Sequence, residues 1–380
     1  MSQFSGPEIK HTLRKLEFPV CSKEALLKIG QLTCGRVPSI KHMDLALDLM
    51  AEFIFHEVDR RGNKRTLPLT TMQEIQLVEV LYDYFNSVNN DTARNSVFLS
   101  LFSGTTAIIR SGILSKLVSM AIGIPSHFIL ISASTLMQQL GNTSPNSYRL
   151  ANALVKDYFV LMPNSSKQLH LVPRLAPQFA SNFLTAVADI YFADVKKGPL
   201  IFPPATLLET ITDWVSENTQ LCVAAQQTQS ALPPGAIAME ATTPFAGLLK
   251  WCILAPIYRQ TSEIYGKLHL GLIENMLEIP HSNPPRAIFA QHLIISIGNI
   301  CRYAVDLQNR SRKSDPTERQ KMFLEDTALH LCLDRFAQAI QIALSVNCVY
   351  GNIGDMINQL KQLPFNKLMA IVINSYKNKT

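Results

Sequence analysis

Apolar residues recur at steps of three and four positions along most of this chain. One stripe comprises Leu207, Leu208, Ile211, Trp214 and Val215. Two more comprise Ile113, Leu114, Leu117, Val118 and Ala121, and then Leu333, Phe336, Ala337, Ile340 and Leu344. Such steps place side chains on one face of an α-helix. Runs that alternate with a period of two between tight-turn signals do not stand out, so the pattern predicts helices and few strands.

Three short motifs predict where helices begin. The run Thr71-Met72-Gln73-Glu74 has the form of a capping box ahead of an apolar stripe. Asp315-Pro316-Thr317-Glu318 combines a capping residue with a proline suited to the first helical position. Thr243-Pro244 is expected to open a third helix in the same way, before Phe245.

Short Pro-, Gly- and Ser-containing breaks separate these helices, as at 163–166, 233–235 and 283–285. Helices in series with short connections and no sheet predict an all-α fold, a HEAT/ARM-like α-solenoid of antiparallel helix pairs. The breakers between Gly198 and Pro204 divide the chain into two helical-repeat halves, 36–197 and 198–380, or lie within one continuous solenoid. Residues 1–35 are set apart as an N-terminal segment because they match poorly to the family whose resemblance is given below.

Composition restricts the class of protein. Of the 380 residues, 47% are hydrophobic and only 17% are charged, whereas soluble chains have about 25% charged residues. This composition argues against a largely disordered protein. With so few charged residues, large helix faces have no Lys, Arg, Asp or Glu, and such faces usually pack against the core or against a partner. The net charge of +6 is low for a dedicated nucleic-acid binder, which gathers basic residues on one face.

The cysteines indicate a reducing compartment. There are seven, an odd number, and no Cys-x-x-Cys spacing occurs. That pattern argues against a disulfide framework and against a zinc finger. The N-terminus does not read as a signal peptide. The most apolar segment, 113–137, is interrupted by Lys116, Gly123, Pro125 and His127, so we expect no membrane-spanning helix.

Catalytic and cofactor motifs are missing from the sequence. Neither a dinucleotide-binding glycine motif nor a P-loop occurs, and the start of a zinc-protease motif at His56-Glu57 lacks its second histidine. We interpret His269 and His330 as structural helix residues. Asp334-Arg335 suits an ordinary ion pair with neighbouring helices, a structural role and not a site. No catalytic residue, cofactor or metal is predicted. Both tryptophans, Trp214 and Trp251, are expected in the core.

Two basic clusters are the candidate partner-binding residues. They are Arg60, Arg61, Lys64 and Arg65, and then Arg310, Arg312 and Lys313. Each cluster lies in a predicted loop, where it suits contact with nucleic acid or an acidic partner, or an import signal, or serves only solubility. Neither is interleaved with the aromatic residues that stack on bases.

Several blocks, in order, resemble the Integrator complex subunit 15 family from about residue 40 onward. They are MQEIQLVE at 72–79, YF at 84–85, SLFS at 100–103, LSKLVSMA at 114–121, RLANALVKDY at 149–158, PP at 203–204 with LLE at 207–209, TP to WC at 243–252, AP at 255–256, YGKLHL at 265–270 and LDRFAQA at 333–339.

The resemblance implies a non-enzymatic nuclear subunit of Integrator, the assembly that cleaves nascent RNA, attenuates RNA polymerase II and processes small nuclear RNA ends. It also implies partners in the arm that contains subunits 10, 13 and 14, with the nuclease and phosphatase in other subunits. Two alternatives remain at this point. A helical-repeat RNA- or DNA-binding module would gather Lys and Arg on one concave face, and a helical-bundle enzyme would gather carboxylates and histidines in one pocket.

Overall fold

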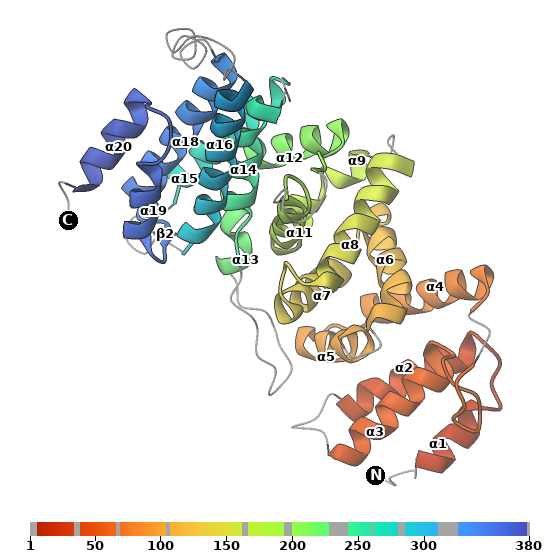
Figure 1. Ribbon diagram of the computed structural model, residues 1–380. Coiled ribbons are helices and arrows are strands. Elements are labelled where there is room, and N and C mark those ends of the chain that lie inside the picture. Colours follow the sequence, from red (N-terminus) through yellow and green to blue (C-terminus); the bar gives the residue numbers. More distant parts are fainter. Residues whose placement is uncertain are drawn as a thin grey trace. The chain divides into compact units, whose positions relative to one another are not determined.

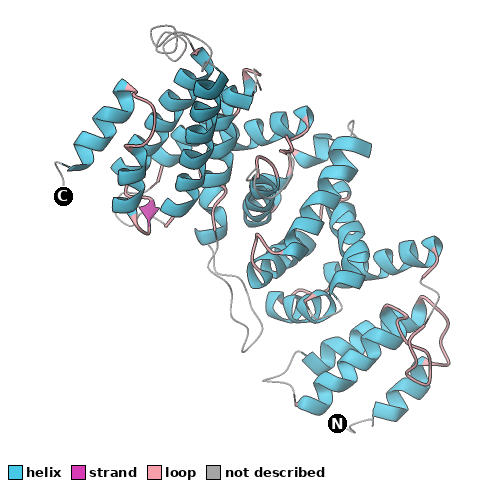
Figure 2. Cartoon of the chain, viewed as in Figure 1, coloured by secondary structure: helices cyan, strands magenta, loops and turns pink. Residues whose placement is uncertain are grey.

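The computed structural model describes eleven ranges of the chain. They are 6–33, 39–65, 69–103, 107–161, 166–193, 200–227, 242–258, 260, 262–279, 286–310 and 326–377. Regular structure in these ranges is almost entirely helical (Figures 1 and 2), which confirms the predicted all-α class. The exception is a short parallel ladder in which β1 (Ile288–Phe289) pairs with β2 (Val349–Tyr350).

The described residues group into two compact units, and the boundary falls after Phe179, inside α11. In the first unit, α5 packs on α7, α4 on α6 and α6 on α8, so a helix commonly contacts the next helix but one. Its elements are α1 (Gly6–Leu13), α2 (Val20–Thr33), α3 (Ile40–Leu49), the π-helix η1 (Met50–Ile54), α4 (Thr71–Ser87), α5 (Asp91–Phe102), α6 (Ala107–Gly123), α7 (His127–Leu140), α8 (Pro145–Val155), the π-helix η2 (Lys156–Leu161), α9 (Ser166–Leu169), α10 (Val172–Leu175) and the start of α11 (Pro177–Ile190).

The second unit is built around α14, which contacts α15, α16 and α18, while α12 packs on α15 and α18 on α20. Besides the end of α11 and the two strands, its elements are α12 (Ala205–Glu217), the 3-10 helix η5 (Leu221–Val223), α13 (Ala224–Gln227), α14 (Phe245–Leu254), the 3-10 helix η6 (Pro256–Tyr258), α15 (Ile264–Leu277), α16 (Ala290–Arg310), α18 (Thr327–Ser345), α19 (Ile353–Leu360) and α20 (Lys367–Lys377). The halves predicted at 36–197 and 198–380 stay a prediction.

The predicted stripes form the cores of the units. In α6 and α12 every predicted stripe residue is buried, and in α18 only Leu344 remains partly exposed. The first unit adds an aromatic cluster in which Phe98 lies 5.1 Å from Phe85 and 5.0 Å from Phe102, measured between ring centroids. Burial of such rings is the main favourable contribution to folding.

Both tryptophans lie in the core of the second unit, as predicted. Trp251 is fully buried and its Nε1 donates to the carbonyl oxygens of Ala188 (3.1 Å) and Tyr191 (3.2 Å). Trp214 is buried beside Phe183, with ring centroids 6.2 Å apart. Unlike that of Trp251, its indole N–H donates to no group in the described ranges.

The helix-start motifs hold only in part. The capping box of α4 exists, but it starts one residue earlier than predicted: Thr70 is the N-cap and Gln73 its partner. Thr70 has the extended backbone a cap requires (φ −67°, ψ 159°), whereas Thr71 is already helical. Helix α14 does begin after Thr243-Pro244, yet the Thr243 hydroxyl donates to a carbonyl oxygen elsewhere in the unit instead of capping. The motif at 315–318 lies outside the described residues.

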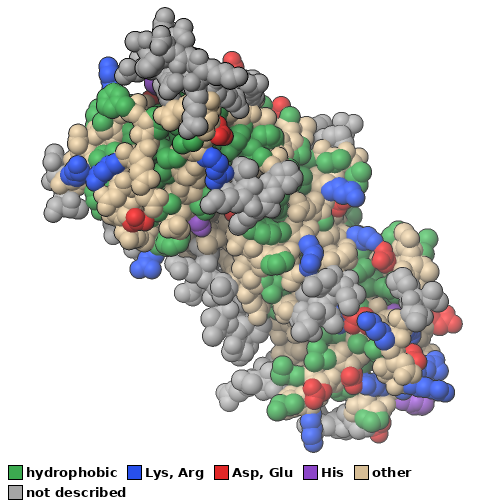
Figure 3. Space-filling view, viewed as in Figure 1, with side chains coloured by type: hydrophobic (Ala, Val, Ile, Leu, Met, Phe, Trp, Pro, Cys, Tyr) green, Lys and Arg blue, Asp and Glu red, His purple; other side chains and the backbone are tan. Residues whose placement is uncertain are grey.

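The surface carries few charges. Figure 3 shows hydrophobic side chains reaching the visible face of the molecule between widely spaced charged ones. Exposed large apolar side chains occur on α3, α4 and α20, among other elements. No helix in the described ranges is long and apolar enough to cross a membrane.

Candidate partner-binding surface

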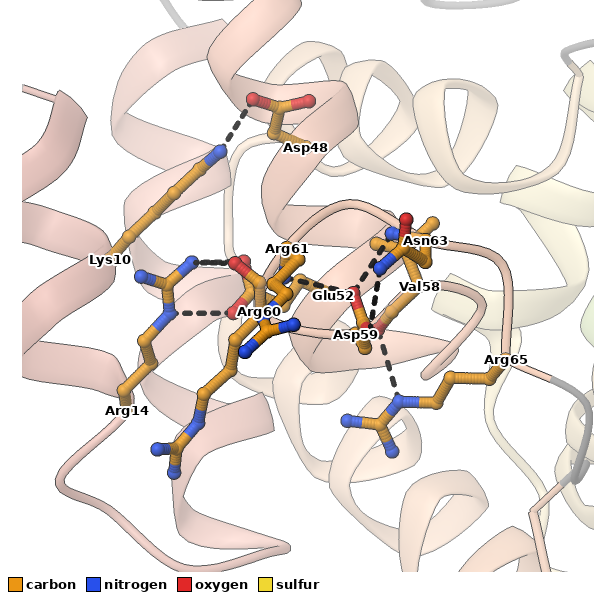
Figure 4. A network of polar contacts seen from close by, with 10 residues as sticks. All are labelled: Lys10, Arg14, Asp48, Glu52, Val58, Asp59, Arg60, Arg61, Asn63 and Arg65. Carbon is orange, nitrogen blue, oxygen red and sulfur yellow. Dashed lines mark hydrogen bonds and ion pairs between the residues drawn. The ribbon is translucent and has the colours of Figure 1, made fainter.

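The first basic cluster lies on a small hairpin between η1 and α4, defined here as the basic hairpin, residues 56–65 (Figure 4). Val58 and Lys64 form an antiparallel bridge across it. Gly62 supplies the left-handed backbone that the tight turn requires, with φ +81°. The hairpin therefore presents the turn residues Arg60 and Arg61 together with Lys64.

Asp59 organises the turn. Its Oδ1 accepts from the backbone N–H groups of Arg61 and Asn63, each at 2.8 Å, and its backbone N–H donates to the carbonyl of Asn63. Hydrogen bonds from Asn63 lower the pKa of Asp59, because they favour the ionised carboxylate. This carboxylate is thus bonded to the turn backbone, and its charge also interacts with Arg65.

Arg110 on α6 anchors the base of the hairpin. Its Nε and Nη2 each donate to one oxygen of Glu57, both at 2.8 Å. The same guanidinium donates to the carbonyl of Leu101 and lies over the Phe55 ring, 4.2 Å from its centroid. A two-pronged contact of this kind fixes orientation as well as distance. The hairpin is consequently held against α6 and positioned by it.

A second arginine joins the hairpin to α1. Arg14 donates to both oxygens of Glu52, at 2.7 and 2.9 Å, and to the carbonyl of Arg60 at 3.3 Å (Figure 4). Nearby, Lys10 pairs with Asp48 at 2.6 Å. Glu57 in the hairpin and Glu52 in η1 are therefore paired with Arg110 on α6 and with Arg14, the residue after α1.

The structure divides the four predicted hairpin residues into two kinds. Arg60, Arg61 and Lys64 are exposed, and no acceptor in the described ranges takes their side chains. Arg65 is exposed too, but its side chain has partners within the hairpin: its Nε donates to the Val58 carbonyl (3.0 Å) and its Nη1 lies 3.1 Å from His56 Nδ1. Burial, reinforced by the Arg65 charge, lowers the pKa of His56.

The second predicted cluster lies largely outside the described residues. Arg310 ends α16, and its side chain, like Arg312 and Lys313, falls in the part of the chain that is not described. Its role stays a prediction. The basic hairpin is thus the candidate site with a defined geometry, and its three exposed cations suit carboxylates or phosphates.

Asp334 and Arg335 have structural contacts with neighbouring elements, as expected, but in the described ranges these are hydrogen bonds and not ion pairs. Arg335 donates instead to the carbonyl of Cys252 at 2.8 Å, and Asp334 accepts from the Asn366 side-chain amide at 2.7 Å. In both cases a neighbouring helix or loop offered an uncharged partner, which the linear sequence did not reveal. His330 on the same helix is partly buried.

His269 on α15 is a buried structural residue. Its Nε2 lies 3.3 Å from Gln338 Oε1 on α18. Burial lowers the pKa of His269 to about 4, because the charged form loses hydration there. The imidazole is therefore neutral at pH 7, which fits a core hydrogen bond between helices.

Six cysteines in the described ranges carry free thiols, and all but Cys301 are buried. Burial raises the pKa of these thiols, to about 12 for Cys252. Across the same ranges no three His, Cys, Asp or Glu side chains are grouped to hold a metal ion. Buried thiols of this kind are inert packing groups.

The anchors Arg14 and Arg110 were missed by sequence reasoning. A signal existed for Arg110, because it interrupts the apolar run 107–109, and an arginine on a buried helix face requires a partner. Its partner, Glu57, lies 53 residues earlier in the chain, and no residue pattern near Arg110 identifies it.

The chain matches known proteins over most of its length. The family model of Integrator complex subunit 15 matches residues 7–365. A Drosophila melanogaster protein named Integrator complex subunit 15 is 38% identical over 367 residues, covering 95% of this chain and 94% of the relative. Proteins of the same name from Mus musculus and Homo sapiens are each 27% identical, covering 97% of this chain and 86% of the relative. The chain belongs to the Integrator complex subunit 15 family.

Proposed function

We propose that this chain is a non-catalytic scaffold subunit of the Integrator complex. The observation that carries the proposal is the family match over residues 7–365. The scarcity of charge and the apolar side chains exposed on several helices support it, because such surfaces suit protein contacts.

The proposed architecture is a HEAT-like solenoid of antiparallel helix pairs. Contacts between a helix and the next but one, as between α4, α6 and α8, support it, since stacked helix pairs bury a continuous core in this way. In this proposal the protein acts in the nucleus, within the arm that contains subunits 10, 13 and 14. There it supports attenuation of RNA polymerase II transcription and the 3′-end processing of small nuclear RNA.

Affinity purification tests the scaffold role. A tagged chain expressed in its native cells, recovered at near-physiological salt and analysed by mass spectrometry, should co-purify Integrator subunits, with subunits 10, 13 and 14 the most abundant. Recovery of other Integrator subunits without these three would refute the assignment to that arm. Recovery of no Integrator subunit would refute the proposed function.

The basic hairpin is the proposed contact for an acidic segment of a partner. Its exposed cations, Arg60, Arg61 and Lys64, have no internal acceptor in the described ranges, and the rigid base keeps them together. The variant Arg60→Glu/Arg61→Glu/Lys64→Glu should lose one or more subunits from the purification. Lys41→Glu, an exposed charge reversal on α3, is the matched control and should lose none.

Nucleic-acid binding is the second candidate, favoured by the same three cations. Three phosphate contacts on single-stranded RNA predict a log–log salt slope of only about −2. We therefore expect weak binding that weakens further with salt, measured by fluorescence anisotropy. Salt-resistant binding of one RNA sequence with a Kd below about 1 μM would contradict a purely protein-binding scaffold.

A further inference from the structure

The last helix of the chain exposes apolar residues on its outer face. Phe365, Leu368 and Ile371, the C-terminal apolar stripe, are spaced three residues apart and are 77%, 38% and 54% exposed. Toward α18, the same helix α20 buries Met369 and Val372. A surface helix normally has one apolar face and one polar face. On the side that its own unit leaves uncovered, α20 therefore exposes apolar residues beside the polar Lys367, Asn374 and Ser375.

The start of α20 holds this stripe in place. Asn366 caps the helix by accepting from the Met369 N–H at 2.9 Å, and its amide donates to Asp334 on α18 at 2.7 Å. A hydrophobic residue just before the cap usually packs on the first turn of its helix. Phe365 has that position yet remains exposed, so a fixed backbone presents its ring outward.

A groove of about 610 Å³ adjoins the stripe. Phe365 and Leu363 form one edge, and the opposite walls come from Val305 on α16 and from Leu329 and Leu333 on α18. The groove is thus mainly apolar, with Gln308, His330 and Gln362 as its polar lining, and it meets the stripe at Phe365. Such a surface suits the apolar side chains of an added helix.

The segment that carries the stripe has only positive charges, whereas the facing elements add three aspartates. Residues 356–377 contain Lys361, Lys367 and Lys377 and neither Asp nor Glu. Lys367 is the first residue of α20, whose first turn has no acidic residue, and a cation at the positive end of the helix dipole is unfavourable. His330 and Cys301 are the titratable groups that line the groove itself in the described ranges. The elements that form its walls also carry Asp326 and Asp334, on or beside α18, and Arg302 and Asp306 on α16. Asp334 is bonded to Asn366, Asp326 to Tyr303.

We propose that the C-terminal apolar stripe and its groove bind an amphipathic helix of another protein, whose apolar face covers Phe365, Leu368 and Ile371 and whose flanking acidic residues pair with Lys361 and Lys367. This inference rests on the proposed scaffold role and names one contact surface for it. A second copy of the chain fits poorly, because in a twofold contact the segment 356–377 would face the same segment, which has lysines but no Asp or Glu to pair with them.

Zero-length cross-linking tests the contact directly. The tagged full-length chain, purified with its co-purifying subunits, is treated with a carbodiimide, which joins a lysine amine to a carboxylate only in direct contact. We expect cross-links from Lys361 or Lys367 to Asp or Glu in a partner segment with apolar residues at helical spacing. If subunits co-purify but these lysines cross-link to none of them, or only to another copy of the chain, this inference alone is refuted. If no Integrator subunit co-purifies, the proposed function fails and the inference with it.

Two variants and a control complete the test. Phe365→Ser/Leu368→Ser/Ile371→Ser should reduce recovery of the cross-linked subunit at least about tenfold. Lys361→Glu/Lys367→Glu keeps the stripe intact and should also reduce it. Met72→Ser, which removes a 64%-exposed apolar residue from α4, should not. Unchanged recovery with the charge variant overturns the proposal even if the stripe variant fails to fold.

Discussion

Helices α11 and α14 approach so closely that one added methyl group should destabilise the second unit. Gly247 on α14 faces Ala188 on α11, and a Cβ at position 247 would lie 2.6 Å from the Ala188 Cβ and 3.1 Å from its carbonyl oxygen. Backbone atoms cannot rotate away as a flexible side chain can. The variant Gly247→Ala therefore has to separate the two helices.

Two opposing effects set the magnitude. Alanine gains up to about 1 kcal/mol over glycine in a helix, whereas overpacking a tight interface costs about 1–3 kcal/mol, occasionally more. At Gly247 we expect the cost of overpacking to exceed the gain in helix propensity, so that the free energy of unfolding falls by about 1–2 kcal/mol. In a domain of 150–250 residues each kcal/mol shifts Tm by roughly 2–4 °C.

Thermal unfolding followed by circular dichroism measures this loss. Gly298→Ala on α16 is the matched control, because no atom lies within 4 Å of its added Cβ, so this variant should melt at or above the wild-type temperature. Ala188→Gly should cost less in the Gly247→Ala background than in the wild type, since it removes part of the clash. A Gly247→Ala protein that melts at or above wild type would refute the close approach of α11 and α14.

The remaining predictions concern buried groups of the second unit. His269 has a folded-state pKa of about 4 against about 6.5 unfolded, so the unfolded state binds the proton first and stability falls as pH drops from 6.5 towards 4. Denaturant titrations should show a loss of about 2 kcal/mol at pH 5, which His269→Gln should largely abolish. The Cys252 thiol, with a pKa of about 12, should resist iodoacetamide at pH 8 in the native protein and react after denaturation, as mass spectrometry would show. Trp214→Ala should cost about 3–5 kcal/mol and weaken partner recovery in parallel; normal melting with lost partners would identify Trp214 as an interface anchor. Trp251→Phe should lower Tm more than Trp214→Phe, because only Trp251 donates hydrogen bonds that would be lost.

The sequence pattern predicted those features that depend on neighbours a few residues away. The stripes of α6 and α12 are buried because steps of three and four residues define one helix face. The cap of α4 was misplaced by one residue because Thr70 and Thr71 have the same capping chemistry. Only the extended backbone at Thr70 and the reach of Gln73 decide between them.

Contacts between distant residues could not be predicted in this way. Nothing in the local sequence of Glu57 specifies Arg110 as its partner. Asp334 and Arg335 suit ion pairs by their charge, but the fold places the uncharged Asn366 side chain and the Cys252 carbonyl beside them instead. The candidate site was therefore located by its basic residues, while its anchors, and the separate role of Arg65, required the structure.

The anchoring of the basic hairpin has a consequence for how this protein can change in evolution. Removing either Glu57 or Arg110 leaves the other charge without its partner in a largely buried place, which costs about 3–5 kcal/mol for a fully buried pair. Single substitutions at these positions should be eliminated by selection, so the two positions should change together among relatives, to another charged pair or to two apolar residues. Arg60, Arg61 and Lys64 are exposed, so replacing one of them leaves no buried charge without a partner. These three positions can therefore change in each lineage to match its own partner.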